Sequence, residues 1–506
     1  MSVQRVLPSM TEWPLFDAAH TRRIELREQA GLPAHTLMAR AGDAFARLAL
    51  AVAPHAQRVW VAAGPGNNGG DGLEAAALLR QSGREVVVTL LGEASTLPDD
   101  AREALARANA AGVRTVSQNA DAAFIATLDA QDLAIDALLG VGATRPPHGA
   151  IAESIRKLNA LACPVLAADL PSGLHARTGQ PLGEDCVIAT HTLSLLTLKP
   201  GLFTGAGRDH AGTVWFDALG VDTGADDPEA WLSAGEAGRA SFTARRHTQH
   251  KGSFGDVAVV GGAPGMAGAA LLAARAAHAA GAGRVFVEML GGGLTELNLD
   301  PQRPELMFRR GWTQSPAATL AQTTVVCGCG GADAVRASLP RLLSTAARLV
   351  LDADALNALA ADPSLAALLL ARARRQAGTV LTPHPLEAAR LLGCTTAEVQ
   401  ADRLLAAGTL ADRFRCVVVL KGSGSIVAAL GETPRINATG NASLATAGTG
   451  DVLAGWLGGL WAQSGSVSAF STAIQAVAEH GAASRPLALG PMRAGDLIEE
   501  MHRRQG

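Results

Sequence analysis

The sequence predicts an α/β protein of two domains, each built on a largely parallel sheet with helices on both faces. Its apolar runs are continuous rather than alternating, as in VWVAA at 59–63, which is typical of strands buried on both faces. These runs alternate with Gly-rich loops and Ala- and Leu-rich helical stretches, which is the order of βαβ units. A chain of 506 residues also has room for more than one core, at about 150 residues per domain.

The first domain is expected to form a doubly wound sheet that begins near Arg58. We expect strands at 58–64, 84–91, 132–140, 163–173 and 189–201, and helices at 73–83 and 150–161. The pattern weakens between Val221 and Gln249, where acidic, Gly and basic residues mix without periodicity, so a linker is expected there. We therefore divide the chain into domains at 1–222 and 223–506.

A second set of βα units begins at Asp256. Its βα units are expected within 256–290, 323–333, 348–359, 378–393, 416–430 and 437–460, with a strand at 416–420. The uncharged stretch Val452–Ala478 is broken by Gly, Ser and Gln residues, which predicts buried helices rather than a membrane span.

Composition and charge exclude several classes of protein. The 43 Lys and Arg against 46 Asp and Glu give a net charge of −3 without a block of like charge, so we expect no nucleic-acid partner and no membrane partner. There is no Tyr, which excludes catalysis by a phenol. Six scattered Cys without a CxxC pair predict buried thiols in a reducing cytoplasm, and the N-terminal residues lack the apolar core of a signal peptide.

The segment GPGNNGGDG at Gly64–Gly72 follows a predicted strand and precedes a predicted helix. Such a loop lets backbone N–H groups approach an anionic ligand at a helix N-terminus. The glycines fit the GxGxxG spacing of an ordinary dinucleotide fold, which by itself is a weak signal. The polar residues Asn67, Asn68 and Asp71 favour a ligand site over a purely structural turn, because their oxygens can bind a cation or orient a sugar.

Two carboxylates lie at the ends of predicted strands, where open α/β sheets place their sites. Asp136 closes one apolar run and Asp169 follows another, and partial burial there would raise a pKa toward the range of a general acid or base. Each of them could instead cap the next loop or helix. Together with Asn68 and Ser172, Asp136 could supply hard oxygen ligands to a cation.

The segment TAGTGD at Thr446–Asp451 leads into an apolar helix. Small residues before a helix N-terminus can form an anion hole from backbone amides, and the final Asp could take a proton from a substrate hydroxyl as it attacks a phosphoryl group. The competing interpretation is that Asp451 only complements the helix dipole.

Two further segments are less specific. KGSGS at Lys421–Ser425 could cradle a nucleotide or form a hairpin turn, with equal weight. TPHPLE places His384 between two prolines, which favours a site role over a structural one, and Glu387 could organise water on a magnesium ion or simply occupy the first turn of a helix.

At these motifs the chain resembles the NAD(P)H-hydrate repair proteins over nearly its whole length. GPGNNGGDG, DALLGVGATRP and DLPSG look like the epimerase domain of that family, which is Rossmann-like. HKGSFGDVAVVGGAPGMAGAA, PELM, DADALNAL, TPHPLE, KGSGS and NATGNASLATAGTGD resemble its ribokinase-like dehydratase domain, and the fused arrangement is similar to the bifunctional bacterial form, which uses ADP.

The resemblance implies a role for each matching residue. Asp169 and Asp451 would be the catalytic residues. The hydrated nucleotide would contact Asn67, Asn68, Gly69, Gly70, Asp71, Gly140, Val141, Gly142, Ala143, Thr144, Arg145, Pro146 and Asp169 in the first domain, and Ala267, Gly330, His384 and Asp451 in the second. The adenine nucleotide would lie against Lys421, Gly422, Ser423, Gly424, Ser425 and Gly450, and potassium would be bound by Asn68, Asp136 and Ser172.

Three departures from the family pattern stand out: Cys329 replaces a Pro in GCGGA, His175 takes a usually acidic position, and Glu74 takes a usually apolar one. The implied cofactors are potassium, magnesium and ADP, with ATP as the other possible phosphoryl donor. The expected substrates are hydrated NADH and NADPH, and a homo-oligomer is expected.

Two alternatives compete with this interpretation. The second domain could be a plain small-metabolite kinase, although His384 stands where the related kinases usually carry Asn. The first domain could be a non-catalytic nucleotide-binding module, against which the complete NNGGD segment and Asp169 argue.

Overall fold

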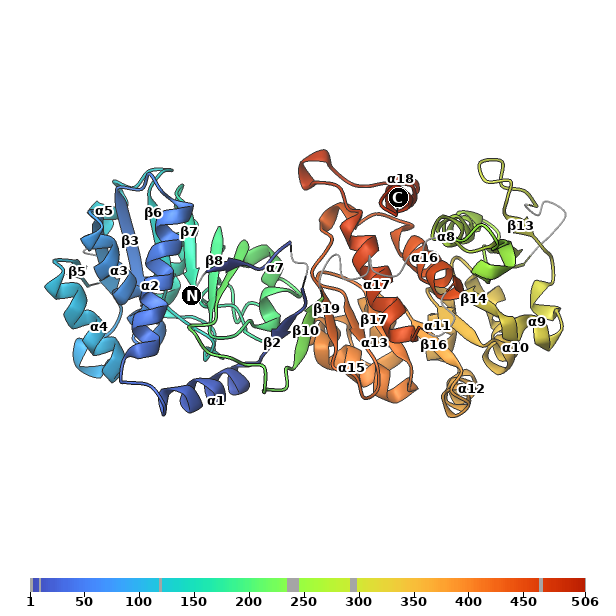
Figure 1. Cartoon of the computed structure of the whole chain (residues 1–506), viewed down its shortest axis with the longest axis horizontal. Coiled ribbons are helices and arrows are strands. Elements are labelled where there is room, and N and C mark those ends of the chain that lie inside the picture. Colours follow the sequence, from blue (N-terminus) through green and yellow to red (C-terminus); the bar gives the residue numbers. More distant parts are fainter. Residues whose placement is uncertain are drawn as a thin grey trace. The chain divides into compact units, whose positions relative to one another are not determined.

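A computed structural model gives the fold, and it describes residues 3–8, 11–117, 121–233, 245–291, 298–463 and 467–505. The chain forms two compact units, each with its own sheet (Figure 1). The first unit comprises Met1–Pro8 and Trp13–Ala230, and the second comprises Ser9–Glu12 and Trp231–Gly506. Both units are α/β, as the sequence predicts.

The sheet of the first unit has the strand order β1-β9-β8-β7-β6-β3-β4-β5. All neighbouring strands are parallel except β1 and β9. The strands are β1 (Gln4–Arg5), β3 (Arg58–Ala63), β4 (Glu85–Leu90), β5 (Arg114–Val116), β6 (Leu133–Ala137), β7 (Val165–Ala168), β8 (His191–Leu195) and β9 (Thr213–Asp217). The short strand β2 (Trp13–Leu15) is not one of the strands of this sheet. The helices are α1 (Ala18–Gln29), α2 (Thr36–Val52), α3 (Asn67–Gln81), α4 (Asp99–Ala110), α5 (Ala122–Ile125), α6 (Gly149–Asn159) and α7 (Gly207–His210).

Both faces of this sheet are apolar because alternate residues of each strand point to opposite sides. In β3, Val59 and Val61 pack with α2 and α3, whereas Trp60 and Ala62 pack with α6 on the other face. This doubly covered sheet is the reason that the strands appear in the sequence as continuous apolar runs.

The sheet of the second unit runs β13-β12-β11-β14-β15-β16-β17-β18-β19-β10. Only β18 is antiparallel to its neighbours. The strands are β10 (Ala230–Ser233), β11 (Asp256–Gly261), β12 (Arg284–Met289), β13 (Met307–Phe308), β14 (Thr323–Cys327), β15 (Arg348–Leu351), β16 (Gly378–Leu381), β17 (Val417–Leu420), β18 (Ile426–Ala428) and β19 (Arg435–Asn437). The helices are α8 (Ala267–Ala279), α9 (Ala317–Gln322), α10 (Leu339–Thr345), α11 (Asp354–Ala361), α12 (Pro363–Arg374), α13 (Pro385–Leu392), α14 (Thr396–Ala401), α15 (Arg403–Phe414), α16 (Thr449–Gln463), α17 (Ala469–Ala482) and α18 (Ala494–Arg503).

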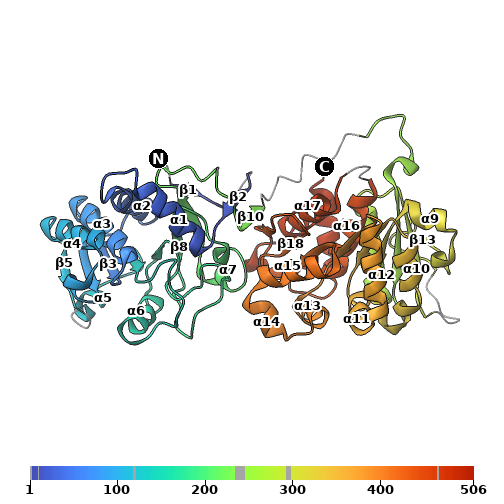
Figure 2. The same ribbon diagram turned by 90° about the horizontal axis from the view of Figure 1, so that it is seen from below.

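Helices α8, α16, α17 and α18 cover one face of this second sheet and share an apolar core with its valines. Helices α12, α13 and α15 lie on the opposite side, which both views show (Figure 2). Helix α16 packs closely on α8 because Gly455 and Gly459 face it. A β-carbon at Gly455 would lie 2.0 Å from the carbonyl oxygen of Ala273.

Two sequence-based expectations about local structure need correction, and a third segment adopts one of the two forms that the sequence left open. Helix α3 begins at Asn67, so most of the GPGNNGGDG segment is helical and only its first residues form the loop. The predicted linker contains the strand β10, which pairs with β19; the rest of that segment lies partly outside the described residues. KGSGS joins the antiparallel strands β17 and β18, so it is a hairpin loop.

Among the described residues, no one helix combines the length and the apolar character needed to cross a membrane. Helices α11 and α12 are long and apolar enough only when they are taken together, and the pair is bent by 105°.

Candidate active sites

Asp169 lies directly after β7, at the carboxyl edge of the first sheet. Its backbone is left-handed, with φ of 64°, which is uncommon for a residue with a side chain. The side chain accepts a hydrogen bond from the Lys199 ammonium and one of 3.1 Å from the Leu195 backbone N–H. Lys199 is fully buried, whereas Asp169 is 8% exposed, so the carboxylate is the part of this ion pair that reaches the surface of the site.

Two more carboxyl groups interact electrostatically with Asp169. Asp71 lies in the second turn of α3, and its pKa is well above the usual value because of burial and the nearby negative charges of Asp169 and Glu25. Glu25 lies on α1, and burial together with Asp169 also raises its pKa, although Arg22 opposes this. The first unit therefore gathers three acidic side chains at one place, with Lys199 as the buried cation beneath them.

Asp136 forms a second polar cluster in the first unit. Its carboxylate accepts hydrogen bonds from the hydroxyl of Ser172 at 2.6 Å, the N–H of Ser172 at 2.8 Å and the N–H of Leu138 at 3.2 Å. All three donors are neutral, and burial raises the pKa of Asp136 to about 6. A fully buried carboxylate with neutral partners is a favourable place for a bound cation.

Asn68 adjoins this cluster through Gly140, since a β-carbon at Gly140 would lie 3.3 Å from the Asn68 side-chain oxygen. The Asn68 side-chain nitrogen is buried and has no hydrogen-bond partner in the described part of the chain. The segment 140–146 continues from there and packs through Pro146 against Gly183. The structure thus brings together Asn68, Asp136, Ser172 and the start of the predicted 140–146 binding segment.

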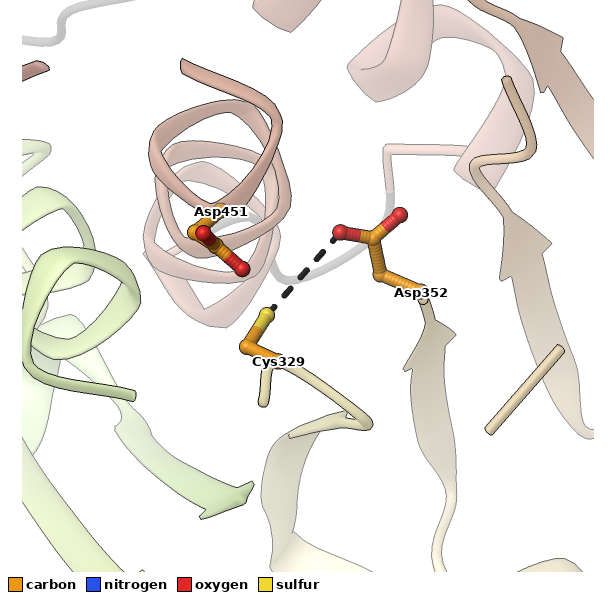
Figure 3. Close-up of side chains that lie close together, drawn as sticks. All are labelled: Cys329, Asp352 and Asp451. Carbon is orange, nitrogen blue, oxygen red and sulfur yellow. Dashed lines mark hydrogen bonds between the residues drawn. The ribbon is translucent and has the colours of Figure 1, made fainter. Parts of the chain in front are cut away.

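In the second unit, Asp451 lies in the first turn of α16 and faces two side chains from the sheet (Figure 3). Cys329 follows β14 and Asp352 follows β15. Potential ligand atoms of the three residues all lie within 4.8 Å of one another, and the Cys329 thiol donates a hydrogen bond of 4.0 Å to Asp352 Oδ2. Burial, reinforced by the charges of Asp451 and Asp352, raises the pKa of Cys329 well above its usual value, so the thiol is protonated.

Lys421 completes this cluster from the end of β17. Its ammonium donates a hydrogen bond of 2.8 Å to Asp352 Oδ1 and lies 4.0 Å from Glu387 Oε2. Burial disfavours the charged form of Lys421, but Asp352 and Glu387 outweigh this and raise its pKa. Gly450 lies against the same group, because a β-carbon there would be 3.2 Å from Lys421 Nζ. The predicted nucleotide residues Lys421 and Gly450 are therefore neighbours.

His384 and Glu387 form a reciprocal cap at the start of α13. The His384 Nδ1 atom accepts from the N–H groups of Leu386 at 3.1 Å and Glu387 at 3.3 Å, and Glu387 Oε2 accepts from the His384 N–H at 2.8 Å. Burial and the nearby Lys421 lower the pKa of His384, and burial raises that of Glu387 to about 7. Both residues thus have the structural role that the sequence left open, since they cap helix α13. In this position they lie near Lys421.

The remaining predicted substrate residues of this unit are also adjacent. Gly330 has φ of 60°, and a β-carbon there would lie 2.7 Å from the carbonyl oxygen of Met266, just before Ala267. Its own carbonyl accepts a hydrogen bond of 2.7 Å from Ala263. Gly330 and Ala267 are therefore close to each other, and Gly330 directly follows Cys329 in the sequence.

Four charged or titratable side chains in these sites were not singled out from the sequence: Glu25, Lys199, Asp352 and His480. Lys199 follows a strand within the apolar stretch TLKPG, and a lone charge there was the available signal. His480 on α17 donates from Nε2 to the carbonyl oxygen of Thr449 at 2.9 Å, and no motif pointed to it.

The fold and its two carboxylate sites define a two-domain α/β enzyme, with a Rossmann-like first domain and a ribokinase-like second domain. Residues 34–201 match the family described as the YjeF-related protein N-terminus, and residues 257–503 match the family described as NAD(P)H-hydrate dehydratase. The bifunctional NAD(P)H-hydrate repair enzyme of Escherichia coli (strain K12) is 37% identical, over 97% of this chain and 93% of that protein. The repair enzyme of Leishmania braziliensis is 36% identical, over 91% and 84%. The chain belongs to the family of bifunctional NAD(P)H-hydrate repair enzymes.

Among solved structures, the ADP/ATP-dependent NAD(P)H-hydrate dehydratase of Bacillus subtilis, co-crystallised with ATP and Mg2+, is similar to the second unit. It is 27% identical, with a TM-score of 0.46, and the match covers 54% of this chain and 98% of that one.

Proposed function

We propose that the chain repairs hydrated NADH and NADPH with two activities, one in each unit. The first unit interconverts the R and S epimers of the hydrate. The second unit uses an adenine nucleotide to dehydrate the S epimer, which restores NAD(P)H. The observation that carries this proposal is that each unit holds one carboxylate near a lysine: Asp169 pairs with the fully buried Lys199, and Asp451 interacts electrostatically with the partly buried Lys421.

In the first unit, the substrate carries a hydroxyl group on the carbon next to the ring nitrogen. Asp169 gives a proton to that hydroxyl group as the carbon–oxygen bond breaks and water leaves, and the nitrogen lone pair stabilises the iminium cation that forms. Water then adds to either face of the ring and returns the proton to Asp169. The helical N-terminus at Asn67–Asp71 and the segment 140–146 bind the nucleotide around it, because helix N-terminal amides favour phosphate groups.

In the second unit, Asp451 accepts the proton of the substrate hydroxyl as this hydroxyl attacks the terminal phosphoryl group of the nucleotide. The oxygen–phosphorus bond to the leaving AMP, or to ADP when ATP is the donor, breaks in the same step. The amides of Gly448–Gly450 and the Lys421 ammonium stabilise the charge on the phosphoryl oxygens. Loss of phosphate from the hydroxylated carbon, together with a proton from the neighbouring carbon, then restores the dihydropyridine ring.

The residues present fit both proposed cations. Asn68, Asp136 and Ser172 would hold potassium, since Ser172 donates to the Asp136 carboxylate, whose donors are all neutral, and Asn68 lies against Gly140 a few residues after Asp136. Glu387 would organise water on magnesium, and its carboxylate is a suitable hard ligand whereas the Cys329 thiol is not. Magnesium would supply positive charge to the phosphate oxygens of the nucleotide.

Other parts of the proposal rest on the sequence. We propose domain limits at 1–222 and 223–506, a cytoplasmic location, a homo-oligomeric state, and the absence of nucleic-acid and membrane partners. The substrate and nucleotide residues named from the resemblance, with ADP as the donor, belong to the same proposal.

The testing experiment follows the recovery of reduced-nicotinamide absorbance from a mixture of both epimers, with magnesium and potassium, in the presence of ADP, ATP or no nucleotide. Complete recovery, beyond the share of one epimer and faster than spontaneous epimerisation, is the expected result. Recovery of only one share would contradict the epimerase, and an accumulating phosphorylated product would favour a small-metabolite kinase.

A further inference from the structure

Lys199 is a large, fully buried charged side chain in the first unit, and no sequence motif explains its role. It is fully buried, and it lies between the end of β8 and the first residues of the following turn. Its ammonium group donates to Asp169 Oδ1, to the carbonyl oxygen of Leu195 at 2.9 Å and to that of Thr197 at 2.9 Å, and the Ser194 hydroxyl lies within a longer 3.4 Å. These four acceptors take up the three N–H bonds of the ammonium, so it has no donor left for a substrate.

The contacts of Asp169 are distributed unequally over its two oxygens. Oδ1 accepts from Lys199 and from the Leu195 N–H. Oδ2 accepts no hydrogen bond from the residues that the structure describes, and it is not among their buried unpartnered atoms. One oxygen is therefore anchored, while the other is left for an external partner.

The backbone reinforces this arrangement. Asp169 and Leu196 each end a parallel strand in the left-handed region, with φ of 64° at both. The Asp169 N–H bonds to the carbonyl oxygen of Leu193 at 2.8 Å, which continues the β7–β8 pairing up to the site. Two neighbouring strand ends in an uncommon conformation are held by one buried ammonium, which bonds to groups from both.

We propose that Lys199 is a positioning residue for epimerisation: by anchoring Asp169 Oδ1 it presents Oδ2 as the atom that exchanges the proton with the substrate. This inference rests on the epimerase activity proposed for the first unit. Lys199 acts only through Asp169. The other titratable groups facing Asp169 are Asp71 from α3 and Glu25 from α1.

The test uses the full chain, because the second unit reports on epimerisation. With both epimers and nucleotide present, the wild-type trace has a fast phase from the S epimer and a slow phase limited by conversion of the R epimer. Lys199→Met is expected to slow the second phase by at least about 100-fold, the usual contribution of a positioned acid or base. The fast phase and the KM for the hydrate in the slow phase should stay within about threefold of wild type.

One further readout separates positioning from a purely structural role. In the Asp169→Asn background, Lys199→Met should cause no additional loss, since the residue acts only through Asp169. Lys199→Gln, which keeps a donor without the charge, provides a second variant if the Met variant does not fold.

The matched control is Lys157→Met. Lys157 on α6 also pairs with a fully buried carboxylate, that of Asp121, at 3.1 Å, but neither residue belongs to a candidate site. It should change the melting temperature without changing the slow phase. A folded Lys199 variant with a normal slow phase, or effects of Lys199 and Asp169 that multiply, would overturn the proposal. Absence of the slow phase in the wild-type chain would instead contradict the epimerase activity itself.

Discussion

The Lys421 ammonium donates a hydrogen bond of 2.8 Å to Asp352, and this buried ion pair lies beside the Asp451 carboxylate in the second unit. Burial and the negative charge of Asp352 raise the pKa of Asp451 to about 6, while Lys421 opposes the shift. A carboxylate with such a pKa is ionised at neutral pH and still basic enough to accept a proton from a hydroxyl group. This raised pKa agrees with the proposed role of Asp451 as the base.

Replacement of Asp451 by Asn should abolish dehydration and spare epimerisation. The amide cannot accept the hydroxyl proton, so we expect the dehydration rate to fall by about 100- to 10,000-fold. The epimer exchange catalysed by the first unit, followed by NMR or chromatography, should be unchanged. Asp362→Asn is the matched control, because Asp362 caps the start of α12 and Asn is an equally good capping residue. Nucleotide-dependent recovery of NAD(P)H by the Asp451 variant would show that the assignment is wrong.

The rate of dehydration should rise with pH through about 6, because Asp451 must lose its proton to act as the base. In Asp352→Asn this limb should move to lower pH, since a negative charge that raises the pKa of Asp451 has been removed. The measurement is kcat/KM between pH 5 and 8 at constant ionic strength.

Glu387 titrates in the same range, because burial raises its pKa to about 7. The limb near pH 6 should therefore persist in Glu387→Gln. Its disappearance in that variant would assign the limb to Glu387 and leave Asp451 without support from the pH profile.

The sequence predicts the two α/β units and most strand positions, because continuous apolar runs depend mainly on burial, which is a local property of the residues. It misplaces the start of α3, since Asn67–Gly72 is rich in Gly, which disfavours helices. The tertiary contact explains this: a β-carbon at Gly69 would lie 2.0 Å from the carbonyl oxygen of Gly64. The close contact requires glycine at this helical position. Helix propensities of the residues do not include such contacts, so they cannot predict that the segment is helical.

The candidate sites show the same limit. Asp169 and Asp451 could be proposed from the sequence because each lies in a recognisable motif at a strand or helix end. Lys199 and Asp352 were missed because their roles depend on partners 30 and 69 residues away in the sequence, at Asp169 and Lys421. Charged residues of this kind have a local pattern no different from that of structural ones, and only the folded chain shows which carboxylate each lysine meets.

Potassium should stabilise the first unit more strongly at pH 7 than at pH 5. The pKa of Asp136 is raised from 3.8 to about 6, so the folded state binds more protons than the unfolded state in this range, and stability falls as the pH rises through it. A cation bound to the ionised carboxylate offsets that loss. We expect the melting temperature to rise by several degrees when potassium replaces tetramethylammonium at pH 7, at about 2–4 °C per kcal/mol.

The control for this prediction is Asp136→Asn, in which the effect of potassium on the melting temperature should vanish. The same variant should lose epimerisation and keep dehydration. An equal response to potassium in Asp136→Asn and wild type would place the cation elsewhere.

His480 should make the second unit sensitive to acid. Burial lowers its pKa from 6.5 to about 4, and the neutral ring donates its Nε2 proton to the Thr449 carbonyl oxygen at the start of α16. Between these two values the unfolded state binds more protons than the folded state, so stability is complete above pH 6.5 and is lost as the pH falls toward 4. The loss amounts to about 3 kcal/mol at most, from 1.36 kcal/mol per pKa unit.

His480→Gln keeps a donor near the position of Nε2 and does not titrate. Its free energy of unfolding, measured by urea denaturation from pH 4 to 7, should therefore lack this slope, and dehydration should persist because the first turn of α16 stays anchored. His480→Asn, whose shorter amide cannot reach Thr449, should also remove the slope but should lower the dehydration rate. His502→Gln, at an exposed histidine on α18, serves as the control and should retain the wild-type pH dependence. An unchanged slope in His480→Gln would mean that other groups cause the acid sensitivity of the second unit.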